Sequence, residues 1–179
     1  IKKEVSRISA WLVACSGGGY VAAINEELWE LKNEWCNKMT VMHVDHGIRG
    51  QEARDDAEFV KNFCAERGLA FVCRHVKATD YALQNGLSLE DAARRLRYKA
   101  LFAYAAEAKC DYIVMAHQAD DQAETVLMQL MRGSGTSGLR GMQTASGKLL
   151  RPVLFVRRTE SGAYCLECGL RICTDYTYD

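Results

Sequence analysis

Short apolar runs alternate with helical patterns along this chain, and this alternation restricts the fold more than any other feature. The runs lack the apolar–polar alternation of half-buried strands, so we interpret them as strands buried on both faces. Strands are expected at residues 10–15, 39–44, 69–76, 111–116 and 148–153, with a short terminal strand at 170–173. Helices are expected at residues 20–37, 53–67, 88–108, 120–132 and 159–168. The pattern predicts an α/β fold, with a parallel five-stranded sheet, helices on both faces and right-handed crossovers.

Length and composition favour one domain spanning residues 1–179. Apolar residues make up 49% of the chain, and 23 Lys and Arg balance 23 Asp and Glu. Because the net charge is zero, an RNA site must be a local patch. The sequence has no apolar run long enough for a membrane span and no signal-peptide core, so we expect a cytoplasmic protein with reduced cysteines.

One Cys-x-x-Cys pair, Cys165 and Cys168, occurs among the eight cysteines. A zinc site usually needs a second pair or histidines at metal spacing, and neither accompanies it. The pair therefore does not define a metal site by itself.

The segments that follow the expected strands concentrate glycine, histidine and clustered aspartate. They are residues 16–19, 43–47, 116–124 and, beyond a helix, 133–141. In open parallel sheets, ligands bind beyond the carboxyl ends of the strands. This convergence indicates a nucleotide-using enzyme.

The first of these segments is Ser16-Gly17-Gly18-Gly19, between a strand and a helical pattern. Such a turn can present backbone N–H groups and a helix N-terminus to a phosphate. A flexible turn explains the glycines equally well. The segment matches neither the dinucleotide nor the Walker pattern, and the G-x-G-x-x-G of residues 133–138 follows a helix instead of a strand.

A cluster of acids follows the fourth expected strand. Asp120, Asp121 and Glu124 fall in the first turns of a helix, next to His117. Acids in a first turn complement the helix dipole. However, Asp121 and Glu124 share a face and could bind Mg²⁺ through carboxylate oxygens. We favour a functional interpretation over a capping one.

Two further groups have alternative interpretations. Arg94 and Arg97 share one helix face, which suits a phosphate or RNA backbone but also a solvated surface. His43 and His46 flank Asp45 at the end of the second strand. They are candidates for a metal ligand or general base, and equally for structural histidines.

Together these segments resemble the N-type ATP pyrophosphatase family, and within it the tRNA(Ile)-lysidine synthetase branch. The resemblance covers roughly residues 10–175. The matching segments are Ser16–Gly18, His43–Gly50, Gly86–Glu90, Ala93–Tyr98, Ala116–Thr125, Arg132–Met142, Arg151–Pro152 and Ala163–Cys165. The resemblance implies the adenine nucleotide alpha hydrolase-like, Rossmann-like fold.

The resemblance also implies a two-step reaction. The C2 oxygen of the wobble cytidine attacks the α-phosphorus of ATP, pyrophosphate leaves, and the ε-amine of free L-lysine then displaces AMP. The implied cofactors are ATP and Mg²⁺. The implied partners are the anticodon stem-loop of tRNA(Ile) and lysine, with a homodimer as a candidate assembly and no membrane.

Roles carry over by position within the matching segments. The resemblance implies catalytic roles for His117, Asp121 and Glu124, with Asp121 as the magnesium ligand. It implies nucleotide contacts for Ser16, Gly17, Gly18, Gly19, Tyr20, Val21, His43 and Arg97. It implies contacts with the other substrates for Arg94, Asp120, Arg132, Gly133 and Gly135.

The chain departs from the family pattern at one point in the loop. The family sequence Ser-Gly-Gly-x-Asp-Ser has Tyr20 and Val21 in place of its acid and hydroxyl. We expect weakened ATP turnover, and the change keeps open a non-catalytic ATP- or tRNA-binding homologue. A tRNA thiolase of the same superfamily is the other alternative, with Cys165 and Cys168 as its candidate cysteines. Fuller members carry C-terminal tRNA-binding domains, so residues 1–179 correspond to the catalytic domain.

Overall fold

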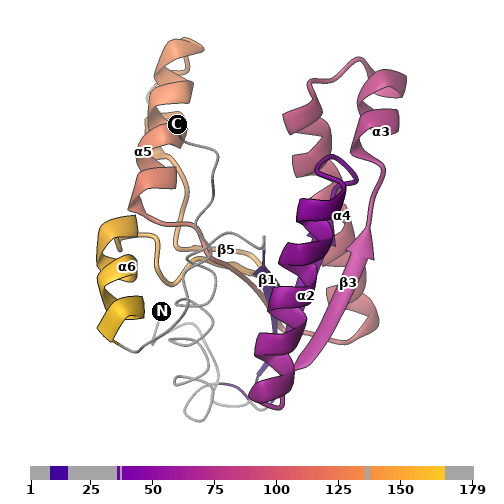
Figure 1. The fold of residues 1–179 in the computed structure, drawn as a ribbon. Helices are drawn as coiled ribbons and strands as arrows, with labels where there is room; N and C mark the ends of the chain where they lie inside the picture. Colours follow the sequence, from indigo (N-terminus) through magenta and orange to yellow (C-terminus); the bar gives the residue numbers. More distant parts are fainter. Residues whose placement is uncertain (1–8, 16–35, 37, 136–137, 168–179) are drawn as a thin grey trace.

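The computed structural model describes residues 9–15, 36, 38–135 and 138–167. Figure 1 shows these residues as one sheet flanked by helices. The strands are β1 (Ala10–Cys15), β2 (Lys38–Asp45), β3 (Ala70–His75), β4 (Tyr112–Met115), β5 (Ala145–Ser146) and β6 (Leu149–Leu150). The helices are α2 (Gln51–Glu66), α3 (Ala78–Asn85), α4 (Leu89–Glu107), α5 (Ala119–Met131), α6 (Arg158–Glu167) and the 3-10 turn η1 (Gly138–Arg140).

The strand order is β3-β2-β1-β4-β6-β5, and only β5 pairs antiparallel with its neighbour. The predicted α/β class and mainly parallel sheet are confirmed, with six strands in place of five. β1 lies between β2 and β4, so the chain crosses to one side of β1 and later to the other. The carboxyl ends of β1 and β4 therefore form a topological switch point, where such sheets bind ligands.

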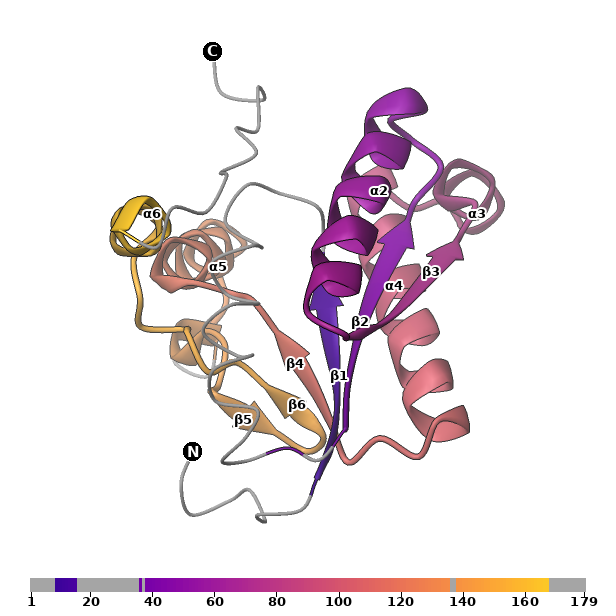
Figure 2. The same ribbon diagram turned by 60° about the horizontal axis from the view of Figure 1, so that its bottom comes forward.

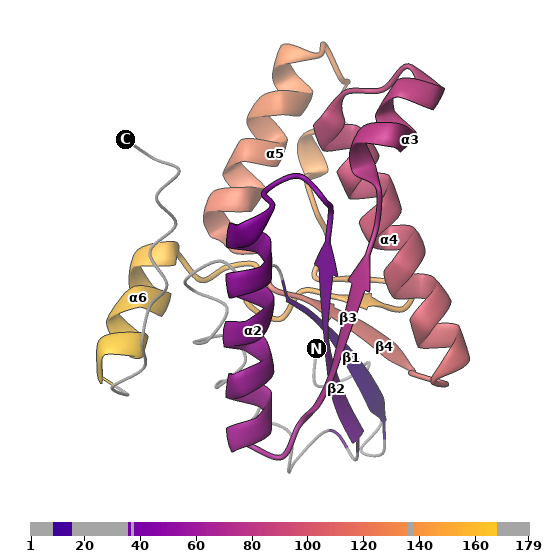
Figure 3. The same cartoon turned by 45° about the vertical axis from the view of Figure 1, so that its right-hand side comes forward.

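The two sides of the sheet bury separate cores, because successive side chains of a strand point to opposite faces. Trp11 and Val13 of β1 pack with α2, whereas Leu12 packs with Leu101 of α4. Figures 2 and 3 show α2 and α4 on opposite sides of the strands. The predicted helices on both faces are confirmed. Ser88 caps α4 as expected, since its Oγ accepts the backbone N–H of Asp91 at 3.1 Å.

The fifth predicted strand is shorter than residues 148–153 and is part of a hairpin. A turn at Gly147 (φ 58°) joins β5 to β6. The strand ends at Leu150, and the next backbone N–H, that of Arg151, donates to the Thr144 carbonyl at 2.7 Å. Pro152 has no N–H to extend a ladder, which explains why the strand stops early.

Helix α3 was not predicted. It buries only two small residues, Ala78 and Ala82, so its apolar periodicity is weak. Its end is defined by Gly86 in the left-handed conformation (φ 61°). The predicted helix 20–37 and terminal strand 170–173 lie outside the described residues. No helix in the described ranges combines the length and apolar character needed to cross a membrane.

Candidate active site

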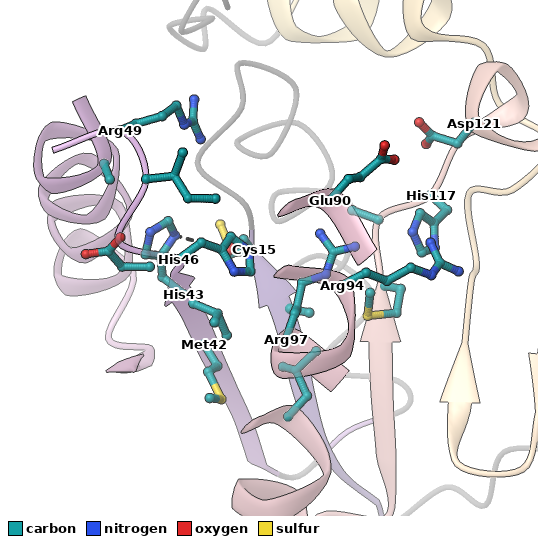
Figure 4. Close-up of a pocket in the computed structure, with 18 of the residues that line it drawn as sticks. Cys15, Met42, His43, His46, Arg49, Glu90, Arg94, Arg97, His117 and Asp121 are labelled. Carbon is teal, nitrogen blue, oxygen red and sulfur yellow. Dashed lines mark hydrogen bonds between the residues drawn. The ribbon is translucent and has the colours of Figure 1, made fainter. Parts of the chain in front are cut away.

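A cavity of about 530 Å³ lies at the carboxyl ends of β1, β2 and β4. This volume is in the usual range for small-molecule sites. Six of the residues to which the family resemblance assigns roles line it, namely His43, Arg94, Arg97, His117, Asp121 and Glu124, and so does His46. Figure 4 shows side chains from β2, α4 and the segment after β4 facing this common space. The structure thus brings together residues that lie up to 81 positions apart, from His43 to Glu124.

Four other singled-out residues do not line the cavity. Arg132, Gly133 and Gly135 follow α5, whose N-terminal end borders the cavity. Asp120 faces α6, because its Oδ2 accepts the backbone N–H of Arg158 at 2.9 Å. Its observed contact is therefore at the start of α6. The loop Ser16–Val21 lies outside the described residues, and substrate contacts for these positions stay predictions.

Helix α4 supplies two positive charges to the cavity. Glu90, Arg94 and Arg97 lie on one helix face, at spacings of four and three residues. The Nε atom of Arg97 is buried and has no hydrogen-bond partner. A buried donor without an acceptor is uncommon and costly in a folded protein. The arrangement suits an anionic ligand that would supply the acceptor.

His117 is held by an arginine from another part of the chain. Arg151 Nε donates to His117 Nδ1 at 3.2 Å, and the buried Arg151 side chain also donates from Nη1 to the Gln143 carbonyl at 2.9 Å. Burial, followed by the charge of Arg151, lowers the pKa of His117 to about 4. His117 is therefore neutral at pH 7.

Asp121 and Glu124 share a cation that the sequence analysis missed. Asp121 Oδ1 accepts from Arg158 Nη2 at 2.7 Å, and the same nitrogen lies 3.6 Å from Glu124 Oε1. Asp121 Oδ2 accepts the backbone N–H of Gln118 at 2.7 Å. The capping contact therefore exists, and it coexists with a position at the cavity wall.

Asp121 is the residue predicted to bind magnesium, and its carboxylate has other contacts in the structure. Both Asp121 oxygens already accept hydrogen bonds, and no group of three metal-ligating side chains gathers within the described part of the chain. Mg²⁺ usually takes one or two carboxylates together with phosphates and water. Magnesium binding by Asp121 stays a prediction, and no step below depends on it.

The two histidines at the end of β2 make one structural contact and have two nitrogens without hydrogen-bond partners. His43 Nδ1 lies 3.2 Å from the Cys15 carbonyl, which ties β2 to β1. His43 Nε2 and His46 Nδ1 are buried without hydrogen-bond partners. Burial lowers the pKa of both histidines. His43 is therefore neither a fully satisfied core histidine nor part of a described metal site.

The sheet order is that of an open α/β domain, and the arginine-lined cavity lies at its topological switch point. The chain belongs to the PP-loop family, because the family model described as "PP-loop domain" matches residues 1–178.

Relatives named tRNA(Ile)-lysidine synthase match most of the chain. The Geobacillus kaustophilus protein is 35% identical over 170 residues, which cover 93% of this chain and 37% of that protein. The Bacillus subtilis protein is 36% identical over 168 residues, which cover 92% of this chain and 35% of that protein. The chain spans little more than a third of the length of these relatives.

Two solved structures share the fold. The U34-tRNA thiolase NcsA from Methanococcus maripaludis, solved with its 4Fe-4S cluster, gives a TM-score of 0.81 at 19% identity, covering 100% of this chain and 64% of that chain. The NH3-dependent NAD synthetase from Campylobacter jejuni gives 0.62 at 16% identity, covering 94% and 67%. At these identities the likeness shows the fold alone.

Proposed function

We propose that this chain is the ATP-using catalytic domain of a tRNA(Ile)-lysidine synthase. It would activate C2 of the wobble cytidine in a CAU anticodon with ATP and then join that carbon to the ε-amine of free lysine. The names and identities of the relatives support this choice. A cytoplasmic location and homodimer assembly are parts of the proposal.

The observation that carries the proposal is the buried Nε of Arg97 at the cavity, which has no hydrogen-bond partner. Arg94 lines the same space. Arginine binds phosphate strongly through charge-assisted hydrogen bonds. A nucleotide phosphate would therefore satisfy a donor that the ligand-free chain leaves unpaired.

The reaction leaves negative charge on phosphate oxygens in both steps and releases a proton in the second. In the first step the C2 oxygen forms a bond to the α-phosphorus, and pyrophosphate leaves with the bonding electrons. In the second, the lysine nitrogen bonds to C2, AMP carries the oxygen away, and the amine loses a proton. Fixed positive groups such as Arg94 and Arg97 would stabilise negative charge on the phosphate oxygens.

The acidic pair would bind the second substrate. Asp121 and Glu124 hold the guanidinium of Arg158 between them, so their carboxylates can accept a cation at this position. The ammonium of lysine is a cation of the same charge. We propose that the lysine ammonium approaches the same carboxylates. Their negative charge would also make a nearby proton acceptor more basic.

A tRNA thiolase is the second candidate, favoured by the Cys-x-x-Cys pair Cys165 and Cys168. Cys15 is the one cysteine among the described residues that line the cavity. Cys168 lies outside the described residues. Iron in the protein purified without oxygen, together with sulfur transfer to tRNA, would favour this candidate over lysidine formation.

The decisive experiment is ATP-dependent incorporation of labelled lysine into a tRNA transcript with a CAU anticodon. A transcript with a GAU anticodon is the control substrate. At limiting ATP, R97M should strongly reduce incorporation, whereas R95M should retain it, because Arg95 is exposed on α4 and does not line the cavity. Equal incorporation by R97M and R95M would overturn the proposed role of the cavity. Since Tyr20 departs from the family loop, Y20D is assayed in parallel.

A further inference from the structure

The contact between Arg151 and His117 determines where the imidazole carries its proton. An arginine guanidinium offers only donors and stays protonated in proteins. Arg151 Nε points to His117 Nδ1 at 3.2 Å, so Nδ1 must present a lone pair. In a neutral imidazole the proton then resides on Nε2.

Arg151 is itself fixed in place. Its side chain is buried, with Nη1 donating to the Gln143 carbonyl, and its backbone N–H donates to the Thr144 carbonyl. Besides His117, Arg151 thus has one anchor at its guanidinium and one at its backbone. A fixed donor at Nδ1 leaves the ring no alternative hydrogen-bonding arrangement on that side.

The surrounding charges disfavour a second proton on the ring. Arg151 lies beyond β6, and Arg94 and Arg97 of α4 also face His117, while Asp121 of α5 opposes them. Figure 4 shows the Arg94 side chain extending toward His117. An imidazolium here would place two cations within hydrogen-bond distance of each other in a partly buried site.

We infer that Arg151 is a positioning residue that holds His117 as the neutral Nε2–H tautomer, so that His117 donates a hydrogen bond into the cavity and does not act as a general base. Nε2 lies on the side of the ring opposite Arg151, and His117 lines the cavity. Such a donor stabilises negative charge on a ligand oxygen. The catalytic meaning rests on the proposed function, whereas the tautomer does not.

The tautomer can be measured without any activity. Two-bond proton–nitrogen spectra of ring-labelled histidine report which nitrogen is protonated. The chain has four histidines, and the signal that disappears from the spectrum of H117Q belongs to His117. Wild-type His117 should show Nε2–H with a bare Nδ1, and no titration between pH 5 and 8. A protonated Nδ1, or titration near pH 6.5, would overturn the inference.

Variants of arginine test the cause. In R151M the His117 signal should shift to mixed tautomers and titrate within the measured range. In R157M it should not change, because Arg157 is exposed and its backbone N–H bonds to Glu160 instead. An unchanged His117 signal in folded R151M would contradict the assignment to Arg151. If R151M does not fold, the wild-type spectrum still decides the tautomer.

The catalytic consequence has a separate test. Glutamine places an amide donor near the Nε2 position, whereas asparagine places its amide near Nδ1. We expect H117N to lose about 100-fold or more of lysine incorporation, the usual effect of removing one such donor, and H117Q to lose clearly less than H117N. If both variants lose activity equally, and the wild-type rate falls with decreasing pH around a histidine pKa, His117 acts as a general base and the inference is wrong. Absence of lysine incorporation in the wild type and in both His117 variants would refute the proposed function. The spectroscopic result would still stand.

Discussion

Replacing Arg97 by methionine should stabilise the folded chain and weaken ATP binding at the same time. Arg97 carries a buried Nε without a hydrogen-bond partner. Such an unpaired group costs about 1–3 kcal/mol. Methionine occupies similar space without a polar atom, so the free energy of unfolding should rise toward that amount. In a protein of this size, 1 kcal/mol corresponds to about 2–4 °C in Tm.

The effect on binding has the opposite sign. A hydrogen bond from arginine to a charged oxygen contributes about 1.5–3 kcal/mol. At 1.4 kcal/mol for each factor of ten, the loss corresponds to roughly a 10- to 150-fold increase in the Kd for ATP. Calorimetric titration with a non-hydrolysable ATP analogue measures the change in Kd. Thermal unfolding without ligand measures the change in stability.

The control is R95M, which removes an exposed arginine two residues away on α4. It should change neither Tm nor Kd beyond the error of either assay. A lower Tm in R97M together with unchanged ATP affinity would refute the reasoning, because it would mean that Arg97 stabilises the fold and contacts no phosphate.

Three further predictions concern the acids, the histidine and the loop. D121N should lower Tm by about 2–4 °C, because the variant weakens both the helix cap and the 2.7 Å ion pair with Arg158. E124Q should change Tm by about 1 °C or less, since its contact is 3.6 Å and its side chain is 53% exposed. Between pH 6.5 and pH 4, wild type should lose up to about 3 kcal/mol more stability than H117Q in urea titrations. Y20D should increase ATP-dependent pyrophosphate release, measured by a coupled phosphate assay.

The sign of the pH effect follows from the two states of His117. Its pKa is about 4 in the folded chain and near 6.5 when unfolded, so the unfolded chain binds more protons between these values. The stability that this group contributes is present above pH 6.5 and lost as the pH falls toward 4. An equal slope in wild type and H117Q would contradict the lowered pKa. Equal Tm losses in D121N and E124Q would contradict the prediction for the acids. Pyrophosphate release by Y20D at the wild-type rate would contradict the prediction for the loop.

Local patterns predicted what depends on local physics. Buried parallel strands require continuous apolar runs, so β1, β2 and β4 could be located from the sequence. An apolar run also located β3, although β3 is an edge strand and none of its residues is buried. Because ligands bind beyond the carboxyl ends of parallel strands, His43 and Asp121 could be expected near one site, whereas Arg97 was expected there only from the family resemblance. Helix α3 could not be found this way, because the two alanines it buries give little periodic signal.

The arginines that hold the site had no local signal. Arg151 contacts a residue 34 positions away, and Arg158 contacts one 37 positions away. Arg151 belongs to a segment of the family resemblance, but nothing in that segment indicates its partner. Arg158 follows another arginine at the start of α6, a pattern typical of a solvated helix end. Identifying either partner required knowing which strand lies beside β4.

The pairing of β4 with β6 explains the contact between Arg151 and His117. The two strands run parallel with Val114 opposite Leu150, so the chain leaves both at the same edge of the sheet. Three residues after Val114 comes His117, and one residue after Leu150 comes Arg151. The early end of β6, which the turn at Pro152 enforces, therefore places a guanidinium beside the imidazole.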